Sequence, residues 1–250
     1  FPMAGPDAGI VDGAYNQPYA IENYRIDGRP VELSVPVTFW RSVGCSFNAF
    51  MHESFIDEIA AAGKTDPLAL RRKLMEPYPV ATALLDKVAE MSNWESAPPA
   101  GKARGLAFTL SFGTWVAQVV EISDRDGAIK VDKVYAAVDA GLVLDERNFK
   151  AQIMSGIIFG LSAAMQQQIT FADGVVEQQN FGDHDPLRMP QAPEIEIETF
   201  NQEGLVPDLD AIEAALYIGN TVKALTLIIM SLSQRGIVTV LNRRPLQLEV

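Results

Sequence analysis

The chain has little of what disulfide-bonded, metal-binding or nucleic-acid-binding proteins need. It has one cysteine, Cys45, which excludes an intramolecular disulfide, and two histidines, His52 and His184. No spacing of His, Cys and Asp matches a metal site built from protein ligands, so we expect both histidines to be structural. Lys and Arg number 20 against 32 Asp and Glu, a formal charge of −12 without a basic stripe, which opposes nucleic-acid binding.

Segments that would place the chain in a membrane, nucleotide-binding or hydrolase class are also missing. The longest apolar run, Ala224–Met230, is far shorter than the roughly 20 residues that cross a bilayer. The chain opens without a signal peptide and without an initiator Met, so we expect a fragment or a processed chain. There is no Gly-rich nucleotide loop and no nucleophile elbow. Nothing in the sequence distinguishes cytoplasm from periplasm.

What the chain does have is enough apolar residues for a substantial core, 48% of 250. Apolar patterns and turn dipeptides predict two hairpins and a half-exposed strand. These are a hairpin at Asp126-Gly127 between Leu106–Ser123 and Ala128–Val138, a hairpin at Asp173-Gly174, and the strand Glu194–Phe200. Residues 1–38 are predicted to form strands and turns, with extended pieces at Tyr19–Ile26 and Val31–Val37.

Helical spacing predicts several helices between these strands. They cover residues 45–62, ending at Gly63; Pro67 to about Met75, with Asp66 as N-cap; Val80–Met91; and 221–234. The expected fold class is therefore α+β, with helices packed on mixed, mainly antiparallel sheets.

The segment from Asp139 to Met165 predicts a strand end, a turn and a helix that is apolar on nearly every side. A helix of this kind is expected to be buried. Its glycines Gly156 and Gly160 suit close approach by another backbone or a ligand. Gln152, near the start of the helix, offers both a donor and an acceptor to a polar heterocycle. The alternative is a core helix with a satisfied glutamine.

Arg41 is the second candidate site residue, just before the helix predicted at 45–62. Its guanidinium can donate several hydrogen bonds to an oxo or phosphate group, and Gly44 lets the backbone approach such a ligand. The helix N-terminus adds positive potential. The alternative is an arginine that caps a loop. Phe112 is expected on a strand, where an aromatic more often belongs to the core.

Four ordered motifs, spanning roughly residues 8–200, carry a family resemblance. They are W-R-S-V-G from Trp40, N-A-F-x-x-E-S-F-I-D-E from Asn48, the segment Asp139–Met165, and N-F…L-R-M…A-P-E-I-E from Asn180. Together they resemble the molybdopterin-binding large subunit of molybdenum hydroxylases, the xanthine oxidase and aldehyde oxidase family. The likeness is strongest to the isoquinoline 1-oxidoreductase beta-subunit branch, and to its C-terminal part.

The resemblance implies a fold, a cofactor and a reaction. Residues 1–204 would be part of the molybdopterin-cofactor-binding domain, and 205–250 a divergent helical segment of the same domain. The cofactor would be molybdenum-molybdopterin, in its simple or cytosine dinucleotide form, with iron–sulfur clusters on a partner subunit. The reaction would be oxidation of an aldehyde or an N-heteroaromatic carbon, with water as the oxygen source.

The resemblance also implies roles for single residues. Arg41 and Gly44 match the family's arginine and loop beside the molybdenum centre. Gln152 matches the glutamine that contacts the pterin, although the family's following Glu-Gly is Met154-Ser155 here. Phe112 matches an aromatic that can wall the substrate site.

Two departures from the family pattern leave an alternative open. The family's catalytic base is a glutamate in a G-V-G-E-P-G loop that this chain lacks. Glu213 is the candidate base when positions are counted forward from the strand predicted at Glu194–Phe200. Asn220 takes that place when positions are counted back from Arg243-Arg244-Pro245-Leu246, and an asparagine could not act as a base. The chain also lacks the earlier half of the family subunit with its Gly-Gln-Gly type motif.

These departures favour a non-catalytic structural or assembly module, with Leu225–Leu232 as an interface helix. On either reading we expect the surface around Arg41 and Gln152 to bind the remainder of the large subunit or a second copy.

Overall fold

The computed structural model describes residues 8–35, 37–38, 40–200, 239–243 and 246–249. The chain divides into two compact units, residues 1–201 and 202–250. In the second unit, β7 (Thr239–Arg243) pairs antiparallel with β8 (Leu246–Glu249). The helix expected at 221–234, the interface helix Leu225–Leu232 and the candidate base Glu213 lie outside the described residues. Whether both units belong to one domain stays a prediction.

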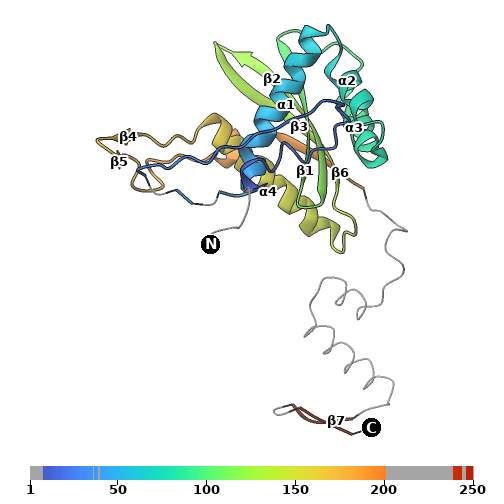
Figure 1. Cartoon of the computed structure of the whole chain (residues 1–250), viewed down its shortest axis with the longest axis vertical. Helices are drawn as coiled ribbons and strands as arrows, with labels where there is room; N and C mark the ends of the chain where they lie inside the picture. The colour runs from blue at the N-terminus through green and yellow to red at the C-terminus, as the bar shows by residue number, and fades with distance from the viewer. Residues whose placement is uncertain (1–7, 36, 39, 201–238, 244–245, 250) are drawn as a thin grey trace. The chain divides into compact units, whose positions relative to one another are not determined.

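A four-stranded sheet forms the centre of the first unit (Figure 1). Its strands are β1 (Lys102–Ser111), β2 (Thr114–Arg125), β3 (Ala128–Asp139) and β6 (Glu194–Phe200), in the order β1-β2-β3-β6. The first three pair antiparallel, and β6 runs parallel to β3. A small hairpin, β4 (Phe171–Ala172) and β5 (Val175–Val176), turns at Asp173-Gly174. The expected α+β class with mainly antiparallel pairing is confirmed.

Four α-helices surround this sheet. They are α1 (Gly44–Ala62), α2 (Pro67–Leu74), α3 (Pro79–Ser92) and α4 (Glu146–Met165). Capping fixes where two of them begin. The Asp66 carboxylate accepts the backbone N–H of Ala69 at 2.9 Å, and Asp145 accepts that of Asn148 at 3.0 Å. Short 3₁₀ helices occupy Ala8–Ile10 and Met189–Gln191. None of the described helices has both the length and the hydropathy to cross a bilayer.

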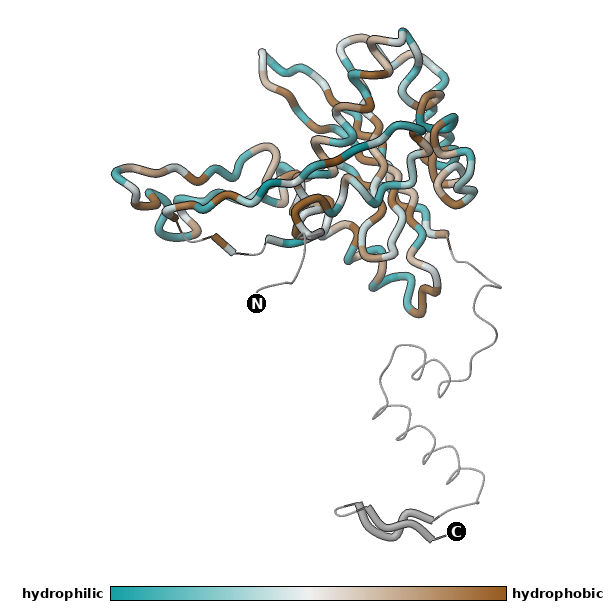
Figure 2. Tube along the Cα trace, in the orientation of Figure 1, coloured by the Kyte–Doolittle hydropathy of each residue, from teal (hydrophilic) through white to brown (hydrophobic). Residues whose placement is uncertain are grey.

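The two faces of the sheet carry separate hydrophobic clusters. On one face, α1 and α3 pack on the sheet through residues such as Ile56, Leu85 and Phe108, and α2 packs on these two helices. On the other, Ile157 of α4 packs against Val134 of β3. Side chains alternate across a strand, so neighbouring residues enter opposite clusters. Figure 2 shows hydrophobic positions recurring in the strands and in the helices beside them.

Two strand predictions are wrong. Phe112 and Gly113 have φ of 48° and 80°, which is type I′ turn geometry, so the expected strand Leu106–Ser123 is a hairpin. No described part of residues 8–38 forms a strand. The free edge of β1 could have paired with such a strand, but side chains accept hydrogen bonds from its backbone N–H groups instead. The N–H of Phe108 donates to Glu53 at 2.7 Å, and the N–H of Leu110 donates to Gln17 at 2.8 Å.

The expectation that α4 is buried on every side is also wrong. Within this helix only Ile157 and Ser162 are buried. Ile153 and Leu161 pack with Ile157 on the sheet, whereas Met154 on another side is exposed. The sheet covers one face of the helix, and no described element covers the others fully. Because α4 is apolar on nearly every side but covered on one face, it leaves apolar side chains exposed.

Candidate functional site

A pocket of about 520 Å³ lies where the loop before α1 meets α4. The loop contributes Trp40, Arg41 and Ser42, and the first turns of α1 contribute Phe47 and Phe50. The wall from α4 consists of Phe159 and small residues, Gly156, Gly160, Ala163 and Ala164. Two motifs more than a hundred positions apart in the sequence therefore share one pocket.

Arg41 lies against α4 rather than capping its own loop. Its guanidinium carbon is 5.4 Å from the centre of the Phe159 ring, a cation–π contact. The Trp40 ring packs on the same phenylalanine at 5.2 Å. A Cβ on Gly156 would lie 3.9 Å from Arg41 Nη2. Arg41 has no carboxylate partner among the described residues, so its N–H donors can serve an anionic ligand.

The loop that carries Arg41 has an unusual backbone. Ser42 and Val43 have φ of 71° and 49°, a region that β-branched residues rarely enter. The Ser46 hydroxyl donates to the carbonyl of Val43 at 2.7 Å, and the N–H of Val43 donates to that of Trp40 at 3.0 Å. Backbone strain of this kind gathers at functional sites, where surrounding contacts hold it in place.

Gly44 is buried against the N-terminal segment. A Cβ there would come within 2.5 Å of the Gly9 carbonyl oxygen and 2.8 Å of that of Asp12. The Asn48 amide donates to the carbonyls of Ile10 and Asp12 at 2.7 and 2.9 Å. The missing side chain is thus explained by packing of the chain on itself. The expected contact of Gly44 with the cofactor stays a prediction.

The other two predicted site residues, Gln152 and Phe112, do not line the pocket beside Arg41. Gln152 is exposed on α4, one turn before Gly156 and on the same helix face. Phe112 is at the tip of the β1–β2 turn, 79% exposed, and does not line the pocket beside Arg41. The structure therefore brings Arg41 together with the glycine face of α4, near Gln152, and leaves Phe112 out. The roles of Gln152 and Phe112 stay predictions.

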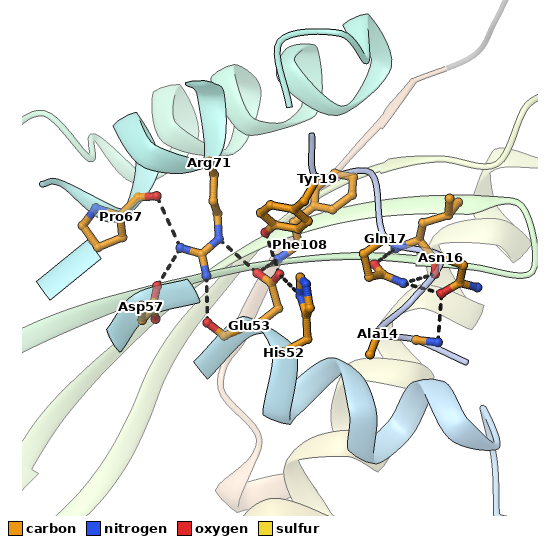
Figure 3. A network of polar contacts seen from close by, with 12 residues as sticks. Ala14, Asn16, Gln17, Tyr19, His52, Glu53, Asp57, Pro67, Arg71 and Phe108 are labelled. Carbon is orange, nitrogen blue, oxygen red and sulfur yellow. Dashed lines mark hydrogen bonds and ion pairs between the residues drawn. The ribbon is translucent and has the colours of Figure 1, made fainter. Parts of the chain in front are cut away.

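A buried polar cluster was missed as a feature of its own. Glu53 accepts hydrogen bonds from the Tyr19 hydroxyl at 2.6 Å, Arg71 Nε at 3.0 Å and the N–H of Phe108 at 2.7 Å (Figure 3). Arg71 is fully buried and also donates to Asp57 at 2.6 Å. The signal was the E-S-F-I-D-E motif, in which Glu53 and Asp57 lie four residues apart on one helix face.

The electrostatics of this cluster keep Glu53 ionised. Burial alone would raise the pKa of Glu53, but the hydrogen bond from His52 and the charge of Arg71 outweigh it and lower the pKa. Burial and the nearby Glu53 charge raise the pKa of Tyr19 well above its usual value. A carboxylate with four donors joins α1 to α2, β1 and the N-terminal segment. The cluster thus fixes the helix that follows the Arg41 loop.

Comparison with known proteins agrees with the motifs. A profile of the molybdopterin cofactor-binding domain matches residues 68–194. The chain is 33% identical over 216 residues to the isoquinoline 1-oxidoreductase subunit beta of Brevundimonas diminuta, covering 83% of this chain and 28% of that protein. It is 31% identical over 180 residues to a membrane-bound aldehyde dehydrogenase (pyrroloquinoline-quinone) of Gluconacetobacter polyoxogenes, covering 63% and 23%.

Among solved structures, quinoline 2-oxidoreductase from Pseudomonas putida 86 matches 45% of this chain and 14% of its own, at 22% identity and a TM-score of 0.33. The chain spans 28% of the isoquinoline relative's length. The profile match covers half of this chain, from α2 through β1, β2, β3 and α4 to the first residue of β6. The chain belongs to the family of molybdopterin-binding subunits of molybdenum hydroxylases.

Proposed function

We propose that this chain forms the Arg41 and α4 side of a molybdenum-cofactor site in an enzyme that oxidises an N-heteroaromatic or aldehyde carbon. The supporting observation is the shared pocket, in which Arg41 faces the glycine side of α4. Two relatives are named for such substrates, one for isoquinoline and one for an aldehyde. Water supplies the oxygen, and the electrons leave to iron–sulfur clusters on a partner subunit.

The residues of the pocket fit a phosphate-bearing pterin. Such a group needs donors for its anionic oxygens, and Arg41 offers a planar set without a carboxylate competitor in the described structure. It also needs a surface that it can approach closely. A Cβ on Gly160 would meet nothing within 4 Å, so this position of α4 borders open space.

Each residue then has a distinct task. Arg41 binds the anionic part of the cofactor, and Gln152 donates to and accepts from the pterin ring. Phe159 holds the Arg41 guanidinium at the pocket by a cation–π contact, and Trp40 packs on the same phenylalanine. The bound cofactor supplies the two-electron oxidation of the substrate. Phe112 contacts the substrate, and Glu213 accepts a proton from the water that provides the oxygen.

The site is completed by other chains or segments. Because the chain spans about a quarter of its isoquinoline relative, the remainder of the large subunit would close over the pocket. The apolar residues Phe50 and Met154, exposed on α1 and α4, are suited to that contact.

A charge-matched pair of variants tests the cofactor role. In Arg41→Gln, molybdenum and pterin content after native purification with the partner chains should fall about tenfold, because charge-assisted hydrogen bonds are lost. Arg125→Gln removes the same charge from the exposed end of β2 and should leave the content unchanged. Equal content in both variants would remove Arg41 from the site.

Labelled water tests the reaction. The purified complex, given isoquinoline or an aldehyde in water carrying heavy oxygen, should place the label in the product. Label from molecular oxygen instead would exclude the proposed reaction. Absence of turnover, together with a site empty of molybdenum, would favour the non-catalytic module.

A further inference from the structure

The N-terminal segment 9–17 packs on the first turn of α1, directly after the loop that carries Arg41. The two backbones approach so closely that each has a glycine at the contact. A Cβ on Gly13 would lie 2.5 Å from Cys45 Cα, and one on Gly44 would lie 2.8 Å from the Asp12 carbonyl oxygen. Larger side chains at these two glycines would therefore force the two segments apart.

Asn48, one turn further along α1, fixes this segment in place. Its amide nitrogen carries two hydrogens and donates to the carbonyl of Ile10 at 2.7 Å and to that of Asp12 at 2.9 Å. The Asp12 carbonyl is the same one that lies beside Gly44. One side chain thus holds the backbone of the N-terminal segment against the residue that follows the Arg41 loop.

The far end of the segment is attached to the sheet. The Gln17 amide donates to the carbonyl of Leu110 at 3.0 Å and accepts from the N–H of the same residue at 2.8 Å. An antiparallel strand would bind the edge of β1 with the same pair of hydrogen bonds. Tyr19 then reaches the carboxylate of Glu53 (Figure 3). Because the segment is anchored at both ends, it can serve as a fixed support for the loop.

The Arg41 loop needs such a support. Ser42 and Val43 have positive φ, which costs free energy in any residue with a side chain, and most in a β-branched one. Such a conformation persists only where its surroundings hold it. If Val43 returned to an ordinary negative φ, the chain before it would turn, and Arg41 would leave the Phe159 ring that it contacts at 5.4 Å.

We propose that Asn48 is a positioning residue for Arg41. It holds segment 9–12 against Gly44, which keeps Ser42 and Val43 in their positive-φ conformation and the Arg41 guanidinium against α4. The consequence for cofactor binding rests on the function proposed above for Arg41, whereas the placement of Arg41 does not.

Trypsin measures this placement directly. It cleaves after Arg41 only when the loop opens into an extended form and the guanidinium leaves Phe159 for the protease. In the full chain without cofactor, Asn48→Asp sets a carboxylate against two carbonyl oxygens and should speed cleavage after Arg41 about tenfold. Cleavage after Lys87, in the middle of α3, should stay the same. Asn23→Asp adds the same charge at an exposed position and should change neither rate.

Gly44→Ala acts on the same contact from the other side. Its methyl group would meet the carbonyl oxygens of Gly9 and Asp12, so cleavage after Arg41 should also become faster. The double variant with Asn48→Asp should be cleaved no faster than the faster single variant, because each change releases the same segment. If Asn48→Asp does not fold, Asn48→Ser replaces it, since a hydroxyl has one donor for the two carbonyls. Unchanged cleavage after Arg41 in the folded variants, or an equal rise after Lys87, would overturn the proposal.

Molybdenum content of the natively purified complex connects this placement to the cofactor. Asn48→Asp should lower the content as Arg41→Gln does, and the double variant should show no further loss. Normal content in Arg41→Gln would reject the cofactor role of Arg41 and leave the cleavage result intact. A fall in Arg41→Gln without one in Asn48→Asp would show instead that the cofactor site does not depend on Asn48.

Discussion

At the scale of single residues, Glu53 within α1 and Arg41 in the loop before this helix show two uses of charge. Glu53 is enclosed by four donors, and the Arg71 that it binds has no exposed surface. Arg41 faces a pocket with donors unused by any carboxylate in the described structure. The first arrangement stabilises the fold, and the second suits a ligand.

Replacing Glu53 by Gln should destabilise the chain strongly. The change leaves the Arg71 charge buried without its main partner, a loss of about 3–5 kcal/mol. Urea unfolding of Glu53→Gln and of Glu58→Gln, an exposed acid on the same helix, measures the difference. A loss similar to that of Glu58→Gln would mean that the buried pair contributes little.

The same cluster predicts how stability depends on pH. The folded-state pKa of Glu53 is lowered, so its contribution is present above the unfolded value of about 4.3 and is lost as the pH falls through the folded value. The pKa of Tyr19 is raised, so its contribution is present below about 10 and is lost as the pH rises further. Glu53→Gln should flatten the acid side of the stability curve, and Tyr19→Phe the alkaline side. Unchanged curves would contradict these assignments.

At the scale of elements, local chemistry was predictable and burial was not. Asp66 and Pro67 begin α2 as expected, and Asp126-Gly127 turns the β2–β3 hairpin, because caps and turns depend on a few adjacent residues. The turn at Phe112-Gly113 lacks the usual Asn or Asp signal and was missed. The exposure of α4 depends on what covers the helix, which its own sequence cannot specify.

The candidate site was partly predictable for the same reason. The shared pocket of Arg41 and α4 follows from contacts between distant segments, and only the family resemblance linked the two. Gly44 is the opposite case. From the sequence alone we expected a ligand to approach this glycine, whereas in the folded chain the backbone at Gly9 and Asp12 fills the space beside it.

The glycine face of α4 can be tested without disturbing the fold. Gly160→Leu places a side chain into open space, and better helix propensity should preserve or raise stability by about 0.5–1 kcal/mol. The same side chain would obstruct the pocket and lower the molybdenum content of the purified complex. Ala151→Leu, on the outer side of the helix, should leave the content unchanged. Normal content in Gly160→Leu would place the cofactor elsewhere.

At the scale of the whole molecule, much apolar surface is left uncovered in the described structure. Phe50 and Phe55 on α1 and Leu144 before α4 are among the exposed large side chains. Patches of this kind mark interfaces, and a net charge of −12 keeps the chain in solution without masking them.

The isolated chain should therefore associate, with itself or with the remainder of its subunit. Light scattering at micromolar concentration should show particles larger than 27.3 kDa, and an apolar dye should bind. A strictly monomeric chain with little dye binding would show that these surfaces need no partner.

The central claim is that this chain contributes to a molybdenum-cofactor site, and elemental analysis of the natively purified complex tests it most directly. We predict about one molybdenum atom for each copy of the chain, together with the pterin and the iron of a partner subunit. A complex that is intact and folded but contains no molybdenum would contradict the claim and leave the fold as a structural module.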